Sequence, residues 1–191
     1  MATRRKYELK KRAEQLAETR RRITEATVEL HRTVGPAATQ ISEVARRAGV
    51  QRVTVYNHFP DDASLLAACS AHWRALHPAP DPTAWDGDLR TALRELYAWY
   101  RETEPMTANV LRDAQTLPAL RAIVDGGLGT YLEGVRAILA RPFAARGRRR
   151  ERVDAALRAA TDFHVWRALA PLGDDEAAEL AAGLVELAAS G

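Results

Sequence analysis

Residues 41–59 read ISEVARRAGVQRVTVYNHF and predict two short helices joined by a tight turn. The first helix is expected over residues 41–48, because apolar side chains recur there at i, i+3, i+4 and i+7, the spacing of one helix face. These side chains are Ile41, Val44, Ala45 and Ala48. Gly49 should end the helix, since glycine readily adopts the left-handed conformation that helix ends favour.

The second helix is expected over residues 51–58, with Val55 and Phe59 as its inward face. Two helices joined by a short turn that contains glycine form a helix-turn-helix. The outward side chains suit a DNA groove, because arginine can bond guanine, asparagine can bond adenine, and threonine or valine can touch a thymine methyl. The outward and flanking side chains are Arg52, Val53, Thr54, Tyr56, Asn57 and His58.

Residues 23–73 resemble the DNA-binding domain of tetracycline-repressor (TetR) family regulators. The family pattern I-A-x-x-A-G-V-S-x-G-T-L-Y-x-H-F, then an apolar L-L, reads here as VARRAGVQRVTVYNHF over residues 44–59, then Leu65-Leu66. Three positions depart from it: Gln51 replaces a serine cap, Val53 a small residue, and Asp62 a common phosphate-contacting lysine. The alternative is a structural helical hairpin without a DNA role.

The resemblance implies an operator-binding surface on the two helices and the loop before them. Arg52, Thr54 and Asn57 are expected at base edges, and Tyr56 and His58 at phosphates. Thr39 is expected to cap the first helix, whose N-terminus can bind a phosphate. The complete predicted set is Thr39, Gln51, Arg52, Val53, Thr54, Tyr56, Asn57 and His58.

The charge of the chain is uneven. The 191 residues carry a net charge of +3, but residues 1–60 hold 13 Lys or Arg against 6 Asp or Glu, and residues 61–191 hold 15 against 19. A basic end on a near-neutral body is typical of a nucleic-acid-binding module attached to another domain. A hydrophobic content of 47% is enough to fill a core.

One long helix is predicted ahead of the helix-turn-helix, over about residues 7–32, because Leu9, Leu16, Ile23 and Leu30 recur every seven residues. A basic arm, residues 1–20, includes the first part of this helix. We expect this basic arm near phosphates or a minor groove, with a coiled coil or a solvated tail as alternatives. Its basic side chains are Arg4, Arg5, Lys6, Lys10, Lys11 and Arg12.

A domain boundary is expected at the proline-rich stretch 77–82, which must be extended. The prediction is an all-α chain: an N-terminal three-helix helix-turn-helix domain, residues 1–76, and a C-terminal helical bundle for ligand binding and dimerisation, residues 83–191. A connecting helix should run to about Leu76. In the bundle, helices are expected over about 88–100, after Pro105, from Pro118 to about 139, and over about 151–169 and 174–189.

The last two predicted helices carry small residues on one face each, which lets helices approach closely. The resemblance implies that such helices form a four-helix-bundle homodimer, and a two-fold pair would read two half-sites. The alternative is that they close the core of a monomer. The faces are Val153, Ala156, Leu157, Ala160 and His164 on one helix, and Ala177, Leu180, Ala181, Leu184 and Ala188 on the other.

Enzymatic and metal chemistry find little support in the sequence. Cys69, His72 and His77 have a loose metal spacing without the four ligands that zinc favours, so neither metal nor cofactor is expected. The single cysteine fits a reducing cytoplasm, and no apolar stretch is long enough for a membrane span. A helical-bundle enzyme that retains a helix-turn-helix remains an alternative.

Aromatic residues gather in the C-terminal part, and aromatic side chains with polar tips can line small-molecule pockets. Three glycines, at 126, 127 and 129, should kink or thin the helix that contains them. The predicted ligand-lining residues are Trp99, Met106, Tyr131, Phe163 and His164.

The sequence thus favours a cytoplasmic, nucleoid-associated bacterial regulator that acts as a homodimer on a palindromic double-stranded operator. It is expected to be a repressor released by a small apolar or aromatic ligand. An effector-free DNA-binding or architectural regulator of the same fold is the alternative.

Overall fold

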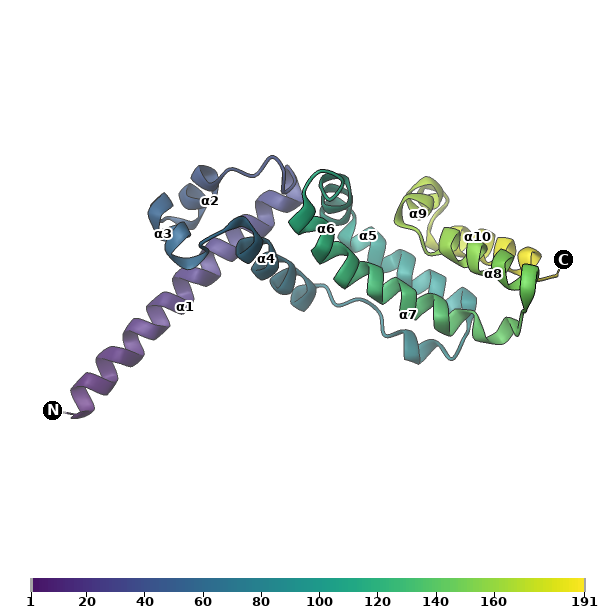
Figure 1. Cartoon of the computed structure of the whole chain (residues 1–191), viewed down its shortest axis with the longest axis horizontal. Helices are drawn as coiled ribbons and strands as arrows, with labels where there is room; N and C mark the ends of the chain where they lie inside the picture. Colours follow the sequence, from purple (N-terminus) through teal and green to yellow (C-terminus); the bar gives the residue numbers. More distant parts are fainter. Residues whose placement is uncertain (1, 191) are drawn as a thin grey trace. The chain divides into compact units, whose positions relative to one another are not determined.

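A computed structural model describes residues 2–190, with side chains from residue 6 onward, and these residues form helices and loops without a strand (Figure 1). The chain divides into two compact units. The first unit comprises Met1–His77 and Pro105–Val124, and the second comprises Pro78–Glu104 and Asp125–Gly191. The chain therefore passes between the units three times. None of the helices in the described residues is long and apolar enough to cross a lipid bilayer.

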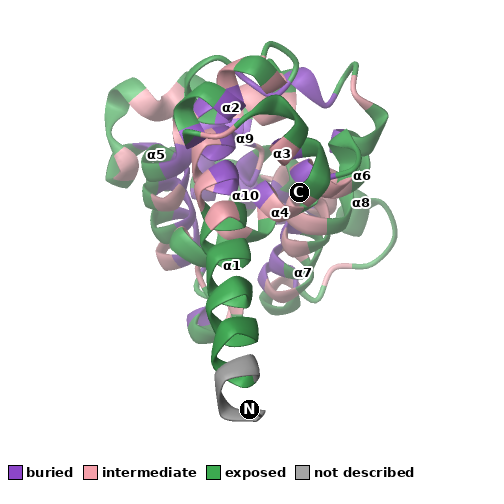
Figure 2. Cartoon of the chain, turned by 90° about the vertical axis from the view of Figure 1, so that its left-hand side faces the viewer, coloured by how far each residue is buried: buried purple, intermediate pink, exposed green. Residues whose placement is uncertain are grey.

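The first unit begins with α1, Ala2–Thr33, which is longer than the predicted 7–32. Its second half is buried on one side through Ile23, Thr27 and Leu30, because the apolar stripe repeats where α2 and α4 pack against it. Residues 6–18 of this helix project from the unit and are exposed (Figure 2). The side chains of Arg4 and Arg5, which belong to the predicted basic arm, lie outside the described residues, as does Met1.

The helix-turn-helix consists of α2, Ile41–Ala48, and α3, Arg52–His58, and α4, Asp62–Leu76, follows it. The bounds agree closely with the sequence pattern. Gly49 lies in the left-handed region at φ 65° and ψ 40°, and the amide of Val50 donates to the carbonyl of Ala45, 3.0 Å away. This glycine-terminated end provides hydrogen bonds to carbonyl groups that have no partner within the helix, and it directs the chain into α3.

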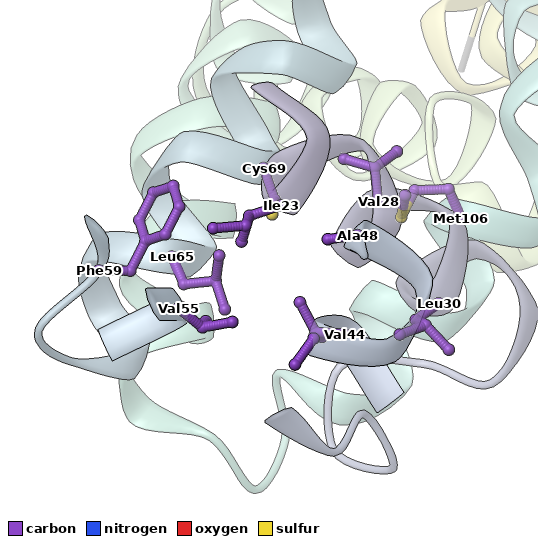
Figure 3. Packing of buried hydrophobic residues seen from close by; sticks show 11 residues of the cluster. Ile23, Val28, Leu30, Val44, Ala48, Val55, Phe59, Leu65, Cys69 and Met106 are labelled. Carbon is purple, nitrogen blue, oxygen red and sulfur yellow. The ribbon is translucent and has the colours of Figure 1, made fainter. Parts of the chain in front are cut away.

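The helices α1, α2, α3 and α4 share one hydrophobic core (Figure 3). Val44 and Val55 project into it from the two helices of the helix-turn-helix, and Ile23 and Leu65 meet them from α1 and α4 (Figure 3). The buried members of this core are Ile23, Val28, Leu30, Val44, Ala45, Ala48, Val55, Phe59, Leu65, Cys69 and Met106.

Met106 belongs to α5, Leu89–Asp113, which is one helix where the sequence predicts a helix and then a separate short one after Pro105. A proline inside a helix removes one backbone hydrogen bond, but packing on both sides of Pro105 outweighs that loss. Tyr97 and Tyr100 are fully buried before it, and Met106 is buried after it. Residues 105–124, expected in the C-terminal domain, therefore lie in the first unit.

The helix predicted from Pro118 to about residue 139 is interrupted. It consists of α6, Pro118–Val124, the π-helical turn η2, Asp125–Gly129, and α7, Thr130–Leu139. The turn contains the three glycines, whose backbones adopt a widened turn more readily than those of other residues, so the expected irregularity is present. The 3-10 turns η1, Pro82–Trp85, and η3, Arg141–Phe143, also belong to the second unit.

The helix predicted over 151–169 is likewise two helices, α8, Gly147–Ala160, and α9, Phe163–Leu169. The side chain of Asp162 accepts from the amides of His164 and Val165, 2.8 and 3.0 Å away, and so begins α9. The hydroxyls of Tyr97 and Tyr100 donate to the carbonyls of Ala160 and Thr161, at 2.7 and 2.8 Å. These two tyrosines satisfy backbone groups that the interruption would otherwise leave unpaired.

The chain ends with η4, Ala170–Leu172, and α10, Asp174–Ser190, which packs along α8. Small residues of α10, among them Ala177, Ala181 and Val185, are buried against the rest of the second unit. The opposite face carries Leu180, Leu184 and Leu187, which are 48%, 55% and 67% exposed. The predicted α10 face therefore mixes buried alanines with exposed leucines.

Candidate nucleic-acid interface

The surface of α3 carries most of the predicted DNA contacts. Val55 and Phe59 fix the helix on the core, with Val55 1% and Phe59 2% exposed. The 3.6-residue period then turns the remaining side chains outward. Gln51, Arg52, Val53, Tyr56 and Asn57 are exposed, and Thr54 and His58 are half-buried. The structure thus brings these seven predicted residues together on one surface.

Two arginines of α1 bind the C-terminal ends of both helices of the helix-turn-helix. Nη1 of Arg20 donates to the carbonyl of His58 at 2.6 Å, and its guanidinium lies 4.0 Å from the ring centroid of Phe59. Nη1 of Arg22 donates to the carbonyl of Ala48 at 3.0 Å. A cation at a helix C-terminus satisfies open carbonyls and complements the helix dipole. Sequence reasoning missed both residues, because Arg20 resembled a charge that interrupts an apolar seam.

The loop before α2 differs from expectation. Thr39 does not cap α2: its hydroxyl donates to the carbonyl of Gly35 at 2.8 Å, and the N-cap position is occupied by Gln40. Thr39 thus closes the loop internally, since its side chain reaches backward along the chain. Neither Gln40 nor Gln51 makes a side-chain cap bond within the described residues.

Three acidic side chains lie near the interface, and two of them, Glu43 and Asp61, make structural contacts. Glu43 accepts from Arg46 and Arg47 at 2.7 and 2.8 Å, and these hydrogen bonds lower its pKa to about 2. Asp61 accepts from the amide of Ser64 at 2.7 Å and caps α4. Asp62 lies exposed in the first turn of α4, where a carboxylate repels a phosphate. The start of α4 is therefore a poor phosphate site.

The end of α5 contacts the segment that leads into the helix-turn-helix. Nδ2 of Asn109 donates to the carbonyls of His31 and Arg32 at 3.0 and 2.9 Å. The buried carboxylate of Asp113 accepts from the amide of Ala37 at 2.9 Å and from Arg112 at 2.7 Å. These contacts fix the loop between α1 and α2, and no periodic pattern in the sequence indicates them.

Gly35 is the one residue of this loop whose backbone requires glycine, at φ 94°. A Cβ there would lie 2.2 Å from Nη2 of Arg112 and 2.5 Å from Oδ2 of Asp113. The loop thus admits these polar side chains because no side chain occupies the space.

Four predicted ligand-lining residues lie in the second unit. The rings of Trp99 and Tyr131 are 6.1 Å apart, and the Tyr131 hydroxyl donates to the carbonyl of Pro80 at 3.0 Å. Phe163 is buried, with its ring edge-to-face on Tyr100 at 5.4 Å. His164 is exposed. Met106 packs instead in the core of the first unit, as described above.

Two of the residues considered as metal ligands, Cys69 and His77, make other contacts. Cys69 is buried, and its thiol donates to the carbonyl of Thr24 at 3.8 Å. Burial raises the pKa of this thiol to about 12, which keeps it protonated. The ring of His77 stacks on Trp73, with centroids 3.9 Å apart.

A short recognition helix, exposed on one face and fixed on three supporting helices, defines a helix-turn-helix DNA-binding domain. Residues 23–69 match the family described as bacterial regulatory proteins, tetR family. The chain therefore carries an N-terminal DNA-binding domain similar to that of this family, which makes it a DNA-binding transcriptional regulator. A comparison with curated proteins gave no match.

Proposed function

We propose that the protein is a homodimeric repressor that binds a palindromic operator and is released from it by a small apolar or aromatic ligand. The observation that carries the DNA-binding part is the surface of α3. Its exposed polar residues are supported by the buried Val55 and Phe59 and by the bond from Arg20 to its last carbonyl. A helix fixed in this way presents Arg52, Thr54 and Asn57 to base edges in a reproducible register.

The dimer is supported by the exposed face of α10. Leu180, Leu184 and Leu187 follow one another at i, i+4 and i+7, with Gly183 exposed among them, so they form one apolar stripe. A stripe of this kind is typical of a surface that another helix covers. Dimerisation through α8 and α10 would place two recognition helices on one operator. A single seven-residue helix contacts too few base pairs to specify an operator alone.

The effector is proposed from the aromatic cluster of the second unit. Trp99 and Tyr131 lie in ring contact where the irregular turn η2 precedes α7, and π-helical turns occur frequently at functional sites. A flat apolar compound would contact these rings, with Phe163 and His164 as further candidates. The hydroxyl of Tyr131 is already bonded to Pro80, which favours a ligand recognised through ring faces.

Selection of DNA fragments by the purified protein tests the operator. Fragments enriched from a random pool should share an inverted repeat whose half-sites are centred roughly 34–36 Å, or a multiple, apart. Placing the selected site in a reporter promoter should lower transcription when the protein is present, and an increase would instead indicate an activator. Enrichment of no common sequence would favour the architectural alternative.

Tryptophan emission tests the effector. A compound that releases the wild-type protein from the selected duplex should also change its tryptophan emission. At the same concentration it should leave the Trp99→Ala and Tyr131→Ala variants bound to the duplex. Ala98→Gly, at an exposed position beside Trp99, provides a control. If apolar and polar compounds alike change neither emission nor DNA binding, the effector-free regulator is the better description.

A further inference from the structure

The basic arm, residues 1–20, has two chemically different faces. At about 3.6 residues per turn, the half of the helix surface that points in the same direction as Arg20 can be separated from the opposite half. The half centred on Arg20, here called the Arg20 face, carries Lys6, Leu9, Lys10, Arg12, Ala13 and Leu16. The outer face carries Tyr7, Glu8, Lys11, Glu14, Gln15 and Glu18.

The separation of charge is complete for the acidic residues. Glu8, Glu14 and Glu18 all lie on the outer face, where Glu18 also pairs with Arg21 at 2.6 Å. The Arg20 face holds three cations and no carboxylate between residue 6 and Arg20. Lys10 lies at its edge, 3.8 Å from Glu14, and both side chains are largely exposed, so this pair is weak and exchangeable.

The Arg20 face also has a defined position beside the recognition helix. Because Arg20 binds the last carbonyl of α3 and covers Phe59, this side of α1 continues the side on which α3 lies. From Arg20 back to Lys6 the helix extends about 20 Å at about 1.5 Å per residue. The described side chains of this segment are exposed, apart from the half-buried Thr19 (Figure 2).

DNA phosphates fit this face better than a second copy of the arm does. Leu9 and Leu16 are 61% and 53% exposed, which is the start of an apolar seam, but Arg20 occupies the next position of that seam. Two such faces packed together would bring like charges close to one another, which a coiled coil disfavours. Lysine and arginine can instead lay their alkyl chains along the leucines and direct their charges to phosphates.

We infer that the Arg20 face of the basic arm binds backbone phosphates of the duplex next to the bases that α3 reads. This inference rests on the proposed DNA binding by α3. The phosphate contacts of the arm would add affinity for DNA that does not depend on the base sequence. Each phosphate neutralised by a cation of the arm should steepen the salt dependence of binding, with a slope of about −0.9 per phosphate in log K against log salt.

Two variants with the same change in net charge separate binding through one face from a general charge effect. Lys6→Gln/Lys10→Gln/Arg12→Gln removes three positive charges from the Arg20 face. Lys11→Glu/Gln15→Glu lowers the charge of the outer face by the same amount. All five positions are exposed, so neither variant disturbs the core. The probes are the duplex selected by the wild type and a scrambled duplex of equal length.

The triple variant should bind both duplexes more weakly and with a flatter salt slope, by about 0.9 for each phosphate that the arm no longer neutralises. The double variant should keep the wild-type slope. Equal slopes in all three proteins would overturn the inference, and so would equal flattening in both variants. A triple variant that changes the oligomeric state without DNA and keeps the wild-type slope would assign the face to self-association. Failure of the wild type to bind the selected duplex would instead count against the proposed function.

Discussion

Asn57 tests the assignment of base contacts at the scale of one residue. Its side chain is exposed on α3, and an asparagine amide can donate to and accept from adenine in the major groove. Asn57→Ala should cost about 1–3 kcal/mol at one operator position and relax the base preference there. Tyr56→Phe, which removes the hydroxyl proposed to bind a phosphate, should weaken binding to all DNA sequences alike. Competition binding to single-base operator variants measures both, and an unchanged preference at every position in Asn57→Ala would refute the assignment.

His31 predicts how stability depends on pH. Burial lowers the pKa of this imidazole to about 4, and attraction to Asp113 opposes the shift only in part. Because the pKa in the folded state is below the ordinary value of about 6.5, the unfolded chain binds more protons between these values, and stability falls as the pH falls through this window. We expect protonation of His31 to lower the free energy of unfolding by about 2 kcal/mol between pH 7 and pH 5.

Denaturant unfolding at the two pH values provides the measurement. His31→Gln should lose less stability than the wild type between pH 7 and pH 5, because the variant has no imidazole to protonate in the unfolded state. Equal losses in the two proteins would show that His31 does not carry the effect. The pKa of Asp113 is also lowered: burial raises it, but Arg112, the amide of Ala37 and His31 together lower it by more, so the carboxylate stays charged in this range.

The orientation of the recognition helix depends on its contact with α1. Arg20→Ala removes the bond to the carbonyl of His58 and the contact over Phe59, so α3 should be less firmly positioned. We expect weaker operator binding with a loss of preference at several base positions. Arg21→Ala is a matched control, because it removes the same charge from a side chain that pairs with Glu18 and Glu25 instead. Selection from a random pool distinguishes them, and equally sharp operator sequences for both variants would contradict this role.

At the scale of the element, the N-terminal helices could be predicted and several C-terminal ones could not. Around Gly49, local chemistry and the apolar period agree, so α2 and α3 appear where expected. At Pro105 the local signal indicates a break that tertiary packing overrides. At Asp162 the pattern continues, but a cap and two tyrosine hydroxyls stabilise an interruption. The tyrosine bonds join residues more than sixty positions apart, and a periodic pattern does not contain them.

The candidate site follows the same rule. Exposure of Arg52, Val53 and Asn57 follows from helical period, whereas the bonds of Arg20 and Asn109 to distant carbonyls depend on how helices meet. Thr39 shows the limit of a short motif, because its hydroxyl can reach forward to a helix or backward into its loop. The loop geometry around Gly35 decides between them.

For the whole molecule, Leu184 tests the proposed dimer. Leu184→Arg should fold normally, because the side chain is 55% exposed in the single chain, but a charge in the centre of the apolar stripe should prevent association. Operator affinity should then fall about 100-fold or more, since one recognition helix binds without its partner. Leu76→Arg, at a leucine of α4 that is 59% exposed, is the control. Sedimentation gives the oligomeric state, and a Leu184→Arg protein that remains dimeric would place the interface elsewhere.

The chain passes between the two units at three positions, and at each of them regular helical hydrogen bonding ends or is interrupted. Pro78 follows α4, Pro105 lies inside α5, and Asp125 begins the π-helical turn. Proline offers no amide hydrogen to the carbonyl one turn earlier, and a π turn departs from the regular hydrogen-bond ladder. The regular helical hydrogen-bond ladder is therefore interrupted at Pro105 and at the π-helical turn.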